Sequence, residues 1–221
     1  MTARTIGRAL RRAPPPSVPA MRVLRRAWSR ELRPLPPREV IRLAIQLLDH
    51  PGPWSRLVGY ELIAHHPGGI QALTPAALRR LSTGLADWGS VDAFACYLSG
   101  PAWREGRLPT RQVHAWLRSP DRWLRRTAVV STVALNVPAR GGHGDTARTL
   151  AVCRQVVDDR DDMVEKALSW ALRSLAPRDP REVARFVARH NDELSARVRR
   201  EVGTKLRTGR KVERRRTGVA T

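Results

Sequence analysis

Cysteine is scarce in this chain, which contains only Cys96 and Cys153. Each stands in an apolar stretch with helical spacing, and neither has a second cysteine or a histidine at metal-ligand spacing. We therefore expect no disulfide framework, no metal site and no cofactor. Both thiols are predicted to be buried and reduced, which suits a cytoplasmic protein.

Long apolar runs are missing as well, because no run approaches the roughly 20 residues that a membrane span needs. Acidic residues are few: 20 Asp and Glu stand against 41 Lys and Arg, so the net charge is +21. This excess predicts a polyanionic partner such as nucleic acid or an anionic membrane surface. Nearly all the basic residues are arginine, whose planar fork suits phosphate. A genome rich in G and C would explain the arginine preference equally well, but not the excess of positive charge.

Helical periodicity extends through most of the chain, and no strand-like alternation competes with it. Helices are separated by short breaks of Pro, Gly or Asp, and pairs recur about every 35 to 40 residues. We therefore expect an all-α fold, a right-handed α-solenoid of HEAT-like antiparallel helix pairs, over residues 20–207. Residues 1–19 are basic and Pro-rich and should be loose, or a short helix at most. Residues 208–221 should form a basic, disordered tail.

Three of the expected helices are the second members of their pairs, and they span residues 88–98, 121–135 and 161–175. The first of them should end at Ser-Gly-Pro, residues 99–101. Since second helices line one side of a curved solenoid, the three helices should share a concave surface. Four side chains would meet there, namely Trp88, Asp92, Arg126 and Trp170.

Each of these four residues has an ordinary structural interpretation beside a functional one. Asp92 stands one turn after Trp88, where a carboxylate either complements the helix dipole or faces a ligand. Arg126 shares a helix row with apolar residues, so it is either paired internally or reaches over them toward a phosphate. Trp170 lies at the rim of an apolar stripe between Lys166 and Arg173, which suits either peripheral core packing or stacking.

Together, the segments resemble the DNA alkylation repair family of AlkD-type DNA glycosylases. The resemblance covers about residues 36 to 207. It is carried by a Trp-x-x-x-Asp helix (88–92), a Trp-Leu-x-Arg segment (123–126), a Lys-Ala-x-x-Trp-x-Leu-Arg segment (166–173), and residues 186–195 followed by an Arg-rich helix (197–201). Val129 stands where the family often has Ile.

The resemblance implies a role for each matched residue. Asp92 matches the family's catalytic carboxylate, Trp88 and Trp170 match the aromatics that embrace the sugar of the damaged nucleotide, and Arg126 matches an arginine that contacts the DNA backbone. Further contacts to DNA are expected from neighbouring basic residues, namely Arg122, Arg125, Lys166 and Arg173.

The implied activity is that of a monomeric, nucleoid-associated hydrolase of base excision repair. It would release cationic N3- or N7-alkylated purines from duplex DNA without base flipping, and it would need no metal or cofactor. The alternative is a non-catalytic HEAT-like scaffold that binds nucleic acid through its basic concave face. Two departures from the family bear on this choice: a shortened N-terminal region, and a longer loop at residues 140–145, which should leave the site intact.

Overall fold

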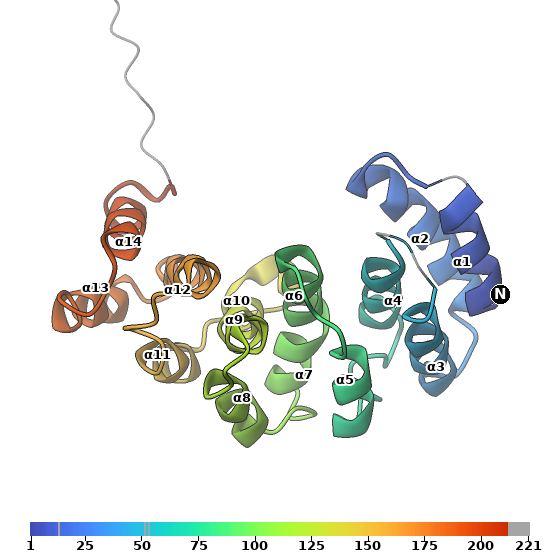
Figure 1. Ribbon diagram of the computed structural model, residues 1–221, viewed down its shortest axis with the longest axis horizontal. Helices are drawn as coiled ribbons and strands as arrows, with labels where there is room; N and C mark the ends of the chain where they lie inside the picture. Colours follow the sequence, from blue (N-terminus) through green and yellow to red (C-terminus); the bar gives the residue numbers. More distant parts are fainter. Residues whose placement is uncertain (13, 51, 53, 212–221) are drawn as a thin grey trace, which may run out of the picture.

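The computed structural model describes residues 1–12, 14–50, 52 and 54–211. These residues form helices joined by turns and include no strand, so the all-α expectation is confirmed. The helices follow one another in a curved array from α1 at one end to α14 at the other (Figure 1). This is the arrangement expected of an α-solenoid, while its right-handed sense stays a prediction.

The helices have the following bounds. In the first half they are α1 (Ala3–Arg12), α2 (Val18–Leu32), α3 (Pro37–Leu47), α4 (Ser55–Ala64), α5 (Pro75–Leu81), α6 (Trp88–Phe94), the π-helix η1 (Ala95–Ser99) and α7 (Gly100–Arg104). In the second half they are α8 (Thr110–Leu117), α9 (Arg122–Ser131), α10 (Val133–Asn136), the 3₁₀ turn η2 (Pro138–Arg140), α11 (Thr146–Arg154), α12 (Asp162–Leu175), α13 (Pro180–Arg189) and α14 (Ala196–Thr208).

Side-chain caps fix the starts of the helices that carry the expected site. Asp87 accepts the amide of Ser90 at the start of α6, and Asp161 accepts the amide of Met163 at the start of α12. Thr74, just before Pro75, and Ser195 cap α5 and α14 in the same way. Because each cap satisfies an amide that has no partner inside its helix, the short linkers set the helix boundaries sharply.

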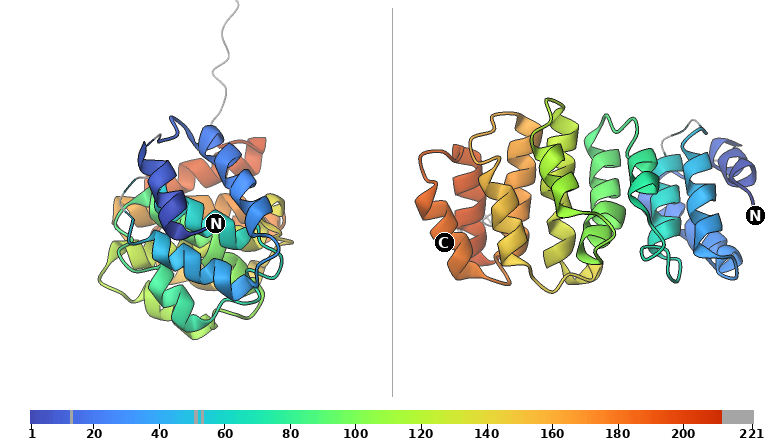
Figure 2. Two further views of the ribbon diagram at one scale, coloured as in Figure 1. Left: turned by 90° about the vertical axis from the view of Figure 1, so that its right-hand side faces the viewer. Right: turned by 90° about the horizontal axis from the view of Figure 1, so that it is seen from below.

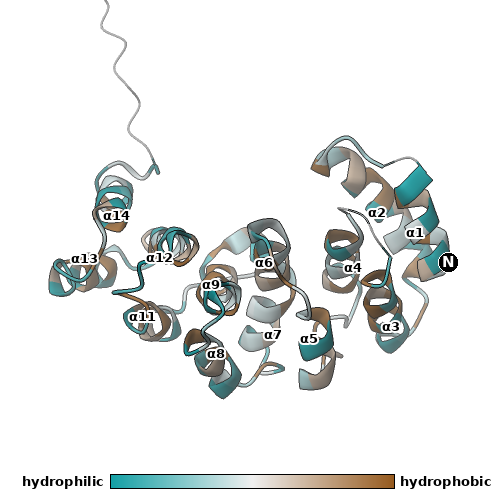
Figure 3. Ribbon diagram, viewed as in Figure 1, coloured by the Kyte–Doolittle hydropathy of each residue, from teal (hydrophilic) through white to brown (hydrophobic). Residues whose placement is uncertain are grey.

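The second helices lie on the inner side of the arc and the first helices on the outer side (Figure 1). Most helices carry one hydrophobic and one hydrophilic face (Figure 3). The views from the end and from below show each helix lying beside its neighbours in the chain, as expected for a repeat array (Figure 2). The apolar faces form one large core from Ile41 to Val202 and a smaller one at the N-terminus.

Residues 3–12 form a short helix, the second of the two alternatives that the sequence left open for this basic segment. Helix α1 packs against α3 and buries Ala3, Ile6 and Leu10, which belong to the N-terminal core. The three residues recur at a spacing of three to four, so they form one apolar face on an otherwise basic helix. The face is short and the segment strongly basic, so composition left open whether this segment would be loose or helical. The expected disordered tail lies mostly outside the described residues, and Thr208 is still part of α14.

The helix that begins at Trp88 does not end at the Ser-Gly-Pro sequence, as the sequence led us to expect. It changes to a π-helical turn over Ala95–Ser99 and continues through Pro101 as α7. Proline has no amide hydrogen to donate and its ring crowds the preceding turn. In a π turn each hydrogen bond spans one residue more than in an α-helix, which widens the helix, and the chain passes through the proline without a break.

This altered segment lies very close to α9 and α10. A Cβ atom on Gly100 would stand 2.5 Å from the carbonyl oxygen of Ser131, and the hydroxyl groups of Ser99 and Ser131 are 2.6 Å apart. The absence of a side chain at Gly100 therefore allows the close approach that brings α6 beside α9.

Both cysteines are free and buried, and burial raises the pKa of each thiol to about 12. They are therefore protonated and unreactive at neutral pH. Among the helices of the described residues, none combines the length and the apolar character that crossing a membrane requires.

Candidate functional site

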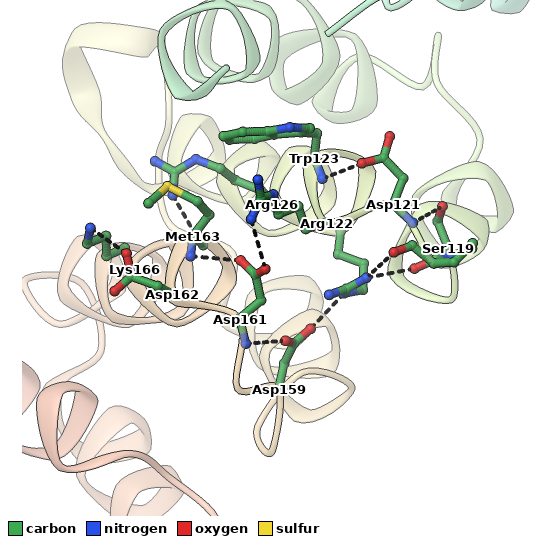
Figure 4. Close-up of polar contacts among 12 residues, drawn as sticks. Ser119, Asp121, Arg122, Trp123, Arg126, Asp159, Asp161, Asp162, Met163 and Lys166 are labelled. Carbon is green, nitrogen blue, oxygen red and sulfur yellow. Dashed lines mark hydrogen bonds and ion pairs between the residues drawn. The ribbon is translucent and has the colours of Figure 1, made fainter. Parts of the chain in front are cut away.

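Asp92 and Arg126 form a two-pronged ion pair between α6 and α9. Nε of Arg126 donates to Oδ1 of Asp92 at 2.9 Å, and Nη2 donates to Oδ2 at 2.8 Å. Nη1 of Arg126 donates to the carbonyl oxygen of Met163, in the first turn of α12, at 2.5 Å (Figure 4). The side chain of Asp92 is 18% exposed and that of Arg126 is 7% exposed. One guanidinium therefore joins three successive second helices at a single point.

The pairing shows that Arg126 fulfils the structural one of its two interpretations, an internal ion pair. The resemblance implied a contact with the DNA backbone, whereas the structure places most of this guanidinium in internal hydrogen bonds. Three of its nitrogens donate to protein oxygens, and these bonds use three of the five N–H groups of an arginine. Contact with DNA stays a prediction for the N–H groups that remain.

Burial raises the pKa of Asp92 above its ordinary value, and the hydrogen bonds and charge of Arg126 offset this only in part. A buried carboxylate resists ionisation because water no longer solvates the charge. The charge that it does carry at neutral pH acts through a medium of lower dielectric constant, where it stabilises a nearby cation more strongly than it would in water.

A cavity of about 570 Å³, here called the central cavity, opens over this pair. Its walls come from α6, α9, α12 and α14 and are mostly cationic and aromatic. The lining residues are Trp88, Arg126, Met163, Lys166, Trp170, Arg173, Arg197, Glu201 and Lys211. Asp92 is not among them, but its partner Arg126 is. The central cavity is therefore a basic chamber with a largely buried carboxylate bonded to one of its lining residues.

The two tryptophans expected at the site both line the central cavity. Trp88 is 64% exposed, which is unusual for so large an apolar side chain, and Trp170 is half-buried against the main core. A second cavity of about 560 Å³ lies against Trp88 and is lined mainly by residues between α3 and α4, by the first turn of α4 and by the start of α6. Trp88 therefore stands between two hollows of the concave side, a position suited to stacking against a ligand.

Lys166 and Arg173 also line the central cavity, as their assignment to DNA binding requires. Each has an acidic neighbour: Nζ of Lys166 lies 2.6 Å from Asp162, and Nε of Arg173 lies 3.5 Å from Glu201. Burial lowers the pKa of Arg173, and the charge of Glu201 opposes this shift. The cavity wall is thus held by ion pairs, and its cations are positioned before any ligand arrives.

Arg122 and Arg125 do not line the central cavity. Arg122 lies over the ring of Trp123 and 3.6 Å from Asp161 (Figure 4). Nε of Arg125 donates to Asp159 at 2.7 Å, and its Nη1 donates to two backbone carbonyls of the preceding linker. These contacts tie neighbouring repeats together, and the expected role of both residues in DNA binding stays a prediction.

Four residues that line the central cavity were not singled out from the sequence, namely Met163, Arg197, Glu201 and Lys211. Arg197 and Glu201 both line the central cavity from α14. Glu201 accepts a hydrogen bond of 2.7 Å from the hydroxyl of Ser169. The two residues stand four positions apart, so they share one face of their helix. That spacing was available in the sequence, but nothing there showed that α14 closes the cavity.

Comparison with known proteins bears on this geometry in one way. No curated protein and no solved structure matches the chain. A family model described as DNA alkylation repair enzyme matches residues 16–206, which is most of the chain, and confirms the resemblance seen in the sequence. The chain therefore belongs to the DNA alkylation repair family, whose members act on DNA.

Proposed function

We propose that this protein is a DNA glycosylase that hydrolyses the N-glycosidic bond of cationic N3- or N7-alkylated purines in duplex DNA. The observation that carries the proposal is the partly buried Asp92–Arg126 pair, whose arginine lines a basic cavity together with Trp88 and Trp170. A carboxylate, two aromatic faces and several cations suit a positively charged sugar held between anionic phosphates.

The departing base needs little acid catalysis from the protein. An alkylated purine is already cationic, so the electron pair of the breaking C1′–N9 bond neutralises the base as it leaves. Positive charge then grows on the deoxyribose, where the anion of Asp92 stabilises it. A water molecule adds its oxygen to C1′ and loses one proton to the carboxylate or to solvent. Atoms and charge balance without a metal or a redox partner.

The lining of the central cavity supports catalysis without base flipping. Base pockets in flipping enzymes recognise the edges of a base through hydrogen bonds. None of the described lining residues is an asparagine or a glutamine, and cations and two indole rings dominate instead. Such walls suit a sugar and its phosphates better than an extruded base. In this proposal the lesion stays in the duplex while its sugar enters the central cavity.

One observation favours the alternative, a non-catalytic scaffold that binds nucleic acid through charge. Both oxygens of Asp92 already accept bonds from Arg126, and Asp92 does not line the cavity. In that case the pair would only join α6 to α9, and the net charge of +21 would account for binding. The two functions differ in whether Asp92 is needed for bond cleavage.

The deciding experiment is single-turnover release of 7-methylguanine from methylated duplex DNA. The glycosylase proposal expects release by the wild-type protein and a loss of at least about 100-fold in Asp92→Asn, because one preorganised electrostatic group typically contributes that much. Affinity for the same duplex should remain, since phosphate contacts dominate binding.

Asp49→Asn is the matched control, because Asp49 is an exposed carboxylate paired with Arg80 outside the central cavity. It should release base at the wild-type rate. Circular dichroism must show that Asp92→Asn is folded, since it leaves a buried guanidinium without its anion. DNA binding without release by the wild-type protein, or undiminished release by folded Asp92→Asn, would support the scaffold.

A further inference from the structure

The glycine-rich loop of residues 137–144, between α10 and α11, has no part in the site described above. It lies between two basic cavities. The first, of about 410 Å³, adjoins α12 and contains Arg173, Arg178, Lys205 and Lys211. The second, of about 290 Å³, adjoins α7 and contains His65, Tyr97, Arg104 and Arg140. No carboxylate is among the described residues that line either cavity.

Two arginines hold the loop in place from opposite sides. Nη1 of Arg104 donates to the carbonyl oxygens of Ala134 and Arg140, at 3.1 Å and 2.9 Å. Nε and Nη2 of Arg178 donate to the carbonyl oxygens of Asn136 and Gly142, each at 3.3 Å. A Cβ atom on Gly142 would stand 2.6 Å from the backbone of Leu135, so the loop folds tightly onto the end of α10. The loop is therefore preorganised.

Of the cations around the loop, Arg104 lies 3.2 Å from Glu105 and Arg173 lies 3.5 Å from Glu201. Among the described residues, three others, Arg140, Arg178 and Lys205, contact only neutral groups. Within the described part of the chain, Arg140 stacks on the ring of Tyr97 at 4.0 Å, and Lys205 donates to the carbonyl oxygen of Gly209 at 2.5 Å. Arg178 contacts only carbonyl oxygens. These partners are neutral, whereas Lys166, Arg173 and Arg197 of the central cavity each lie beside a carboxylate, of Asp162 or Glu201. A cation without a nearby anion attracts phosphate more strongly.

The cavity of about 410 Å³ beside α12 adjoins the central cavity, because Trp170, Arg173 and Lys211 line both. A nucleotide with its sugar in the central cavity would thus direct its backbone past Trp170 toward the loop. We propose that residues 137–144 form a second DNA-backbone site, with one phosphodiester held in each flanking cavity. The direction of the strand rests on the proposed function, whereas the binding site itself does not require base release.

The test is the salt dependence of binding to a fluorescent duplex, measured by anisotropy for Arg140→Gln, Lys205→Gln and the double variant. The logarithm of affinity falls with the logarithm of salt concentration by about 0.9 for each neutralised phosphate. Each single variant should lower that slope by roughly one, and the double variant by roughly two. At physiological salt this is a loss of on the order of 5-fold in affinity for each contact.

A second measurement locates the contacts on the DNA. Single backbone linkages are replaced by uncharged methylphosphonates, and the affinity of each duplex is determined. The wild-type protein should lose affinity at a few linkages, and each single variant should no longer respond to one of them. Arg111→Gln is the matched control, since Arg111 is an exposed arginine on the outer helix α8 and makes the same change in charge.

A slope change no larger than that of Arg111→Gln, or a methylphosphonate pattern unaltered in both folded variants, would overturn the proposal. Failure of the proposed function has a different signature. A wild-type protein that binds with the expected slopes and linkage pattern but releases no base would contradict the glycosylase and leave the loop site standing.

Discussion

Asp92 must be ionised to stabilise a cationic sugar, and its surroundings oppose that ionisation. Burial raises its pKa, and Arg126 offsets the effect only in part. The fold thus favours the protonated form, so ionisation of Asp92 lowers stability as the pH rises through that pKa. Base release should show the opposite trend and decline as the pH falls, starting above the ordinary Asp range near 3.9.

The variant Arg126→Lys tests this account through the pH profile of single-turnover release. Lysine cannot reproduce the two parallel bonds of the guanidinium, so the pKa of Asp92 should rise further and the acid limb should move to higher pH. An acid limb in the same place for both proteins would mean that another group controls the rate.

Trp88 offers the clearest separation of function from stability at a single residue. Because 64% of it is exposed, Trp88→Ala should change the free energy of unfolding by less than about 0.5 kcal/mol. Loss of stacking should reduce base release by roughly 5- to 100-fold, whereas Trp88→Phe should retain part of the activity. Trp103→Ala, at a buried position, should instead lower the free energy of unfolding by about 3–5 kcal/mol. Unaltered release by Trp88→Ala would remove this residue from the proposed site.

Among the elements, the segment from α6 through η1 to α7 determines where the carboxylate lies. Gly100→Ala places a methyl group against the backbone of α9, which cannot move away freely. We expect a net destabilisation on the order of 1–3 kcal/mol in urea unfolding, together with slower base release, since α6 and Asp92 must shift away from Arg126. The comparison is Gly203→Ala in α14, where a Cβ would meet nothing within 4 Å. The free energy of unfolding of Gly203→Ala should rise by about 0.5–1 kcal/mol. Equal stability of the two variants would contradict the close approach of Gly100 to α9.

At the scale of the whole molecule, a buried carboxylate holds the N-terminal helices to the rest of the array. Glu61 of α4 is fully buried and accepts hydrogen bonds from Arg22 and Arg25 of α2, at 2.9 Å and 3.1 Å. Nη2 of Arg22 also donates to the hydroxyl of Tyr97, in η1, at 2.8 Å. Burial alone would raise the pKa of Glu61, but hydrogen bonds with Tyr97 and Arg22 and the nearby charges outweigh it, so the pKa is lowered.

Glu61→Gln should therefore destabilise the protein by about 3–5 kcal/mol near neutral pH, because it leaves two guanidiniums without their anion. A lowered pKa means that the contribution of Glu61 is present above the unfolded pKa near 4.3 and is lost as the pH falls through the folded value. Thermal unfolding at a series of pH values should show the gap between wild type and variant closing in acid. Glu39→Gln, at an exposed i,i+3 pair, should cost less than about 0.5 kcal/mol.

The sequence predicted most helix boundaries well because they depend on local chemistry. Thr74 before Pro75 and Ser195 are caps whose partners lie three residues along the chain. The wrong helix end at residues 99–101 arose because a distant segment decides the outcome: Pro101 is accommodated where η1 widens beside α9. The short apolar face of α1, which the sequence left open, is likewise stabilised by packing on α3.

For the site, the sequence by itself determined which residue types are available and on which helix face each lies. Trp88 and Asp92 are one turn apart whatever the fold, and the charge of +21 already predicts a polyanionic partner. Only the tertiary structure decided that Arg126 is paired with Asp92 and that Arg197 and Glu201 close the central cavity. It also placed Arg104 and Arg178 on the two sides of the glycine-rich loop. The physical reason is distance along the chain: a helix fixes neighbours three and four residues apart, whereas contacts between residues 30 or more apart depend on how whole helices pack.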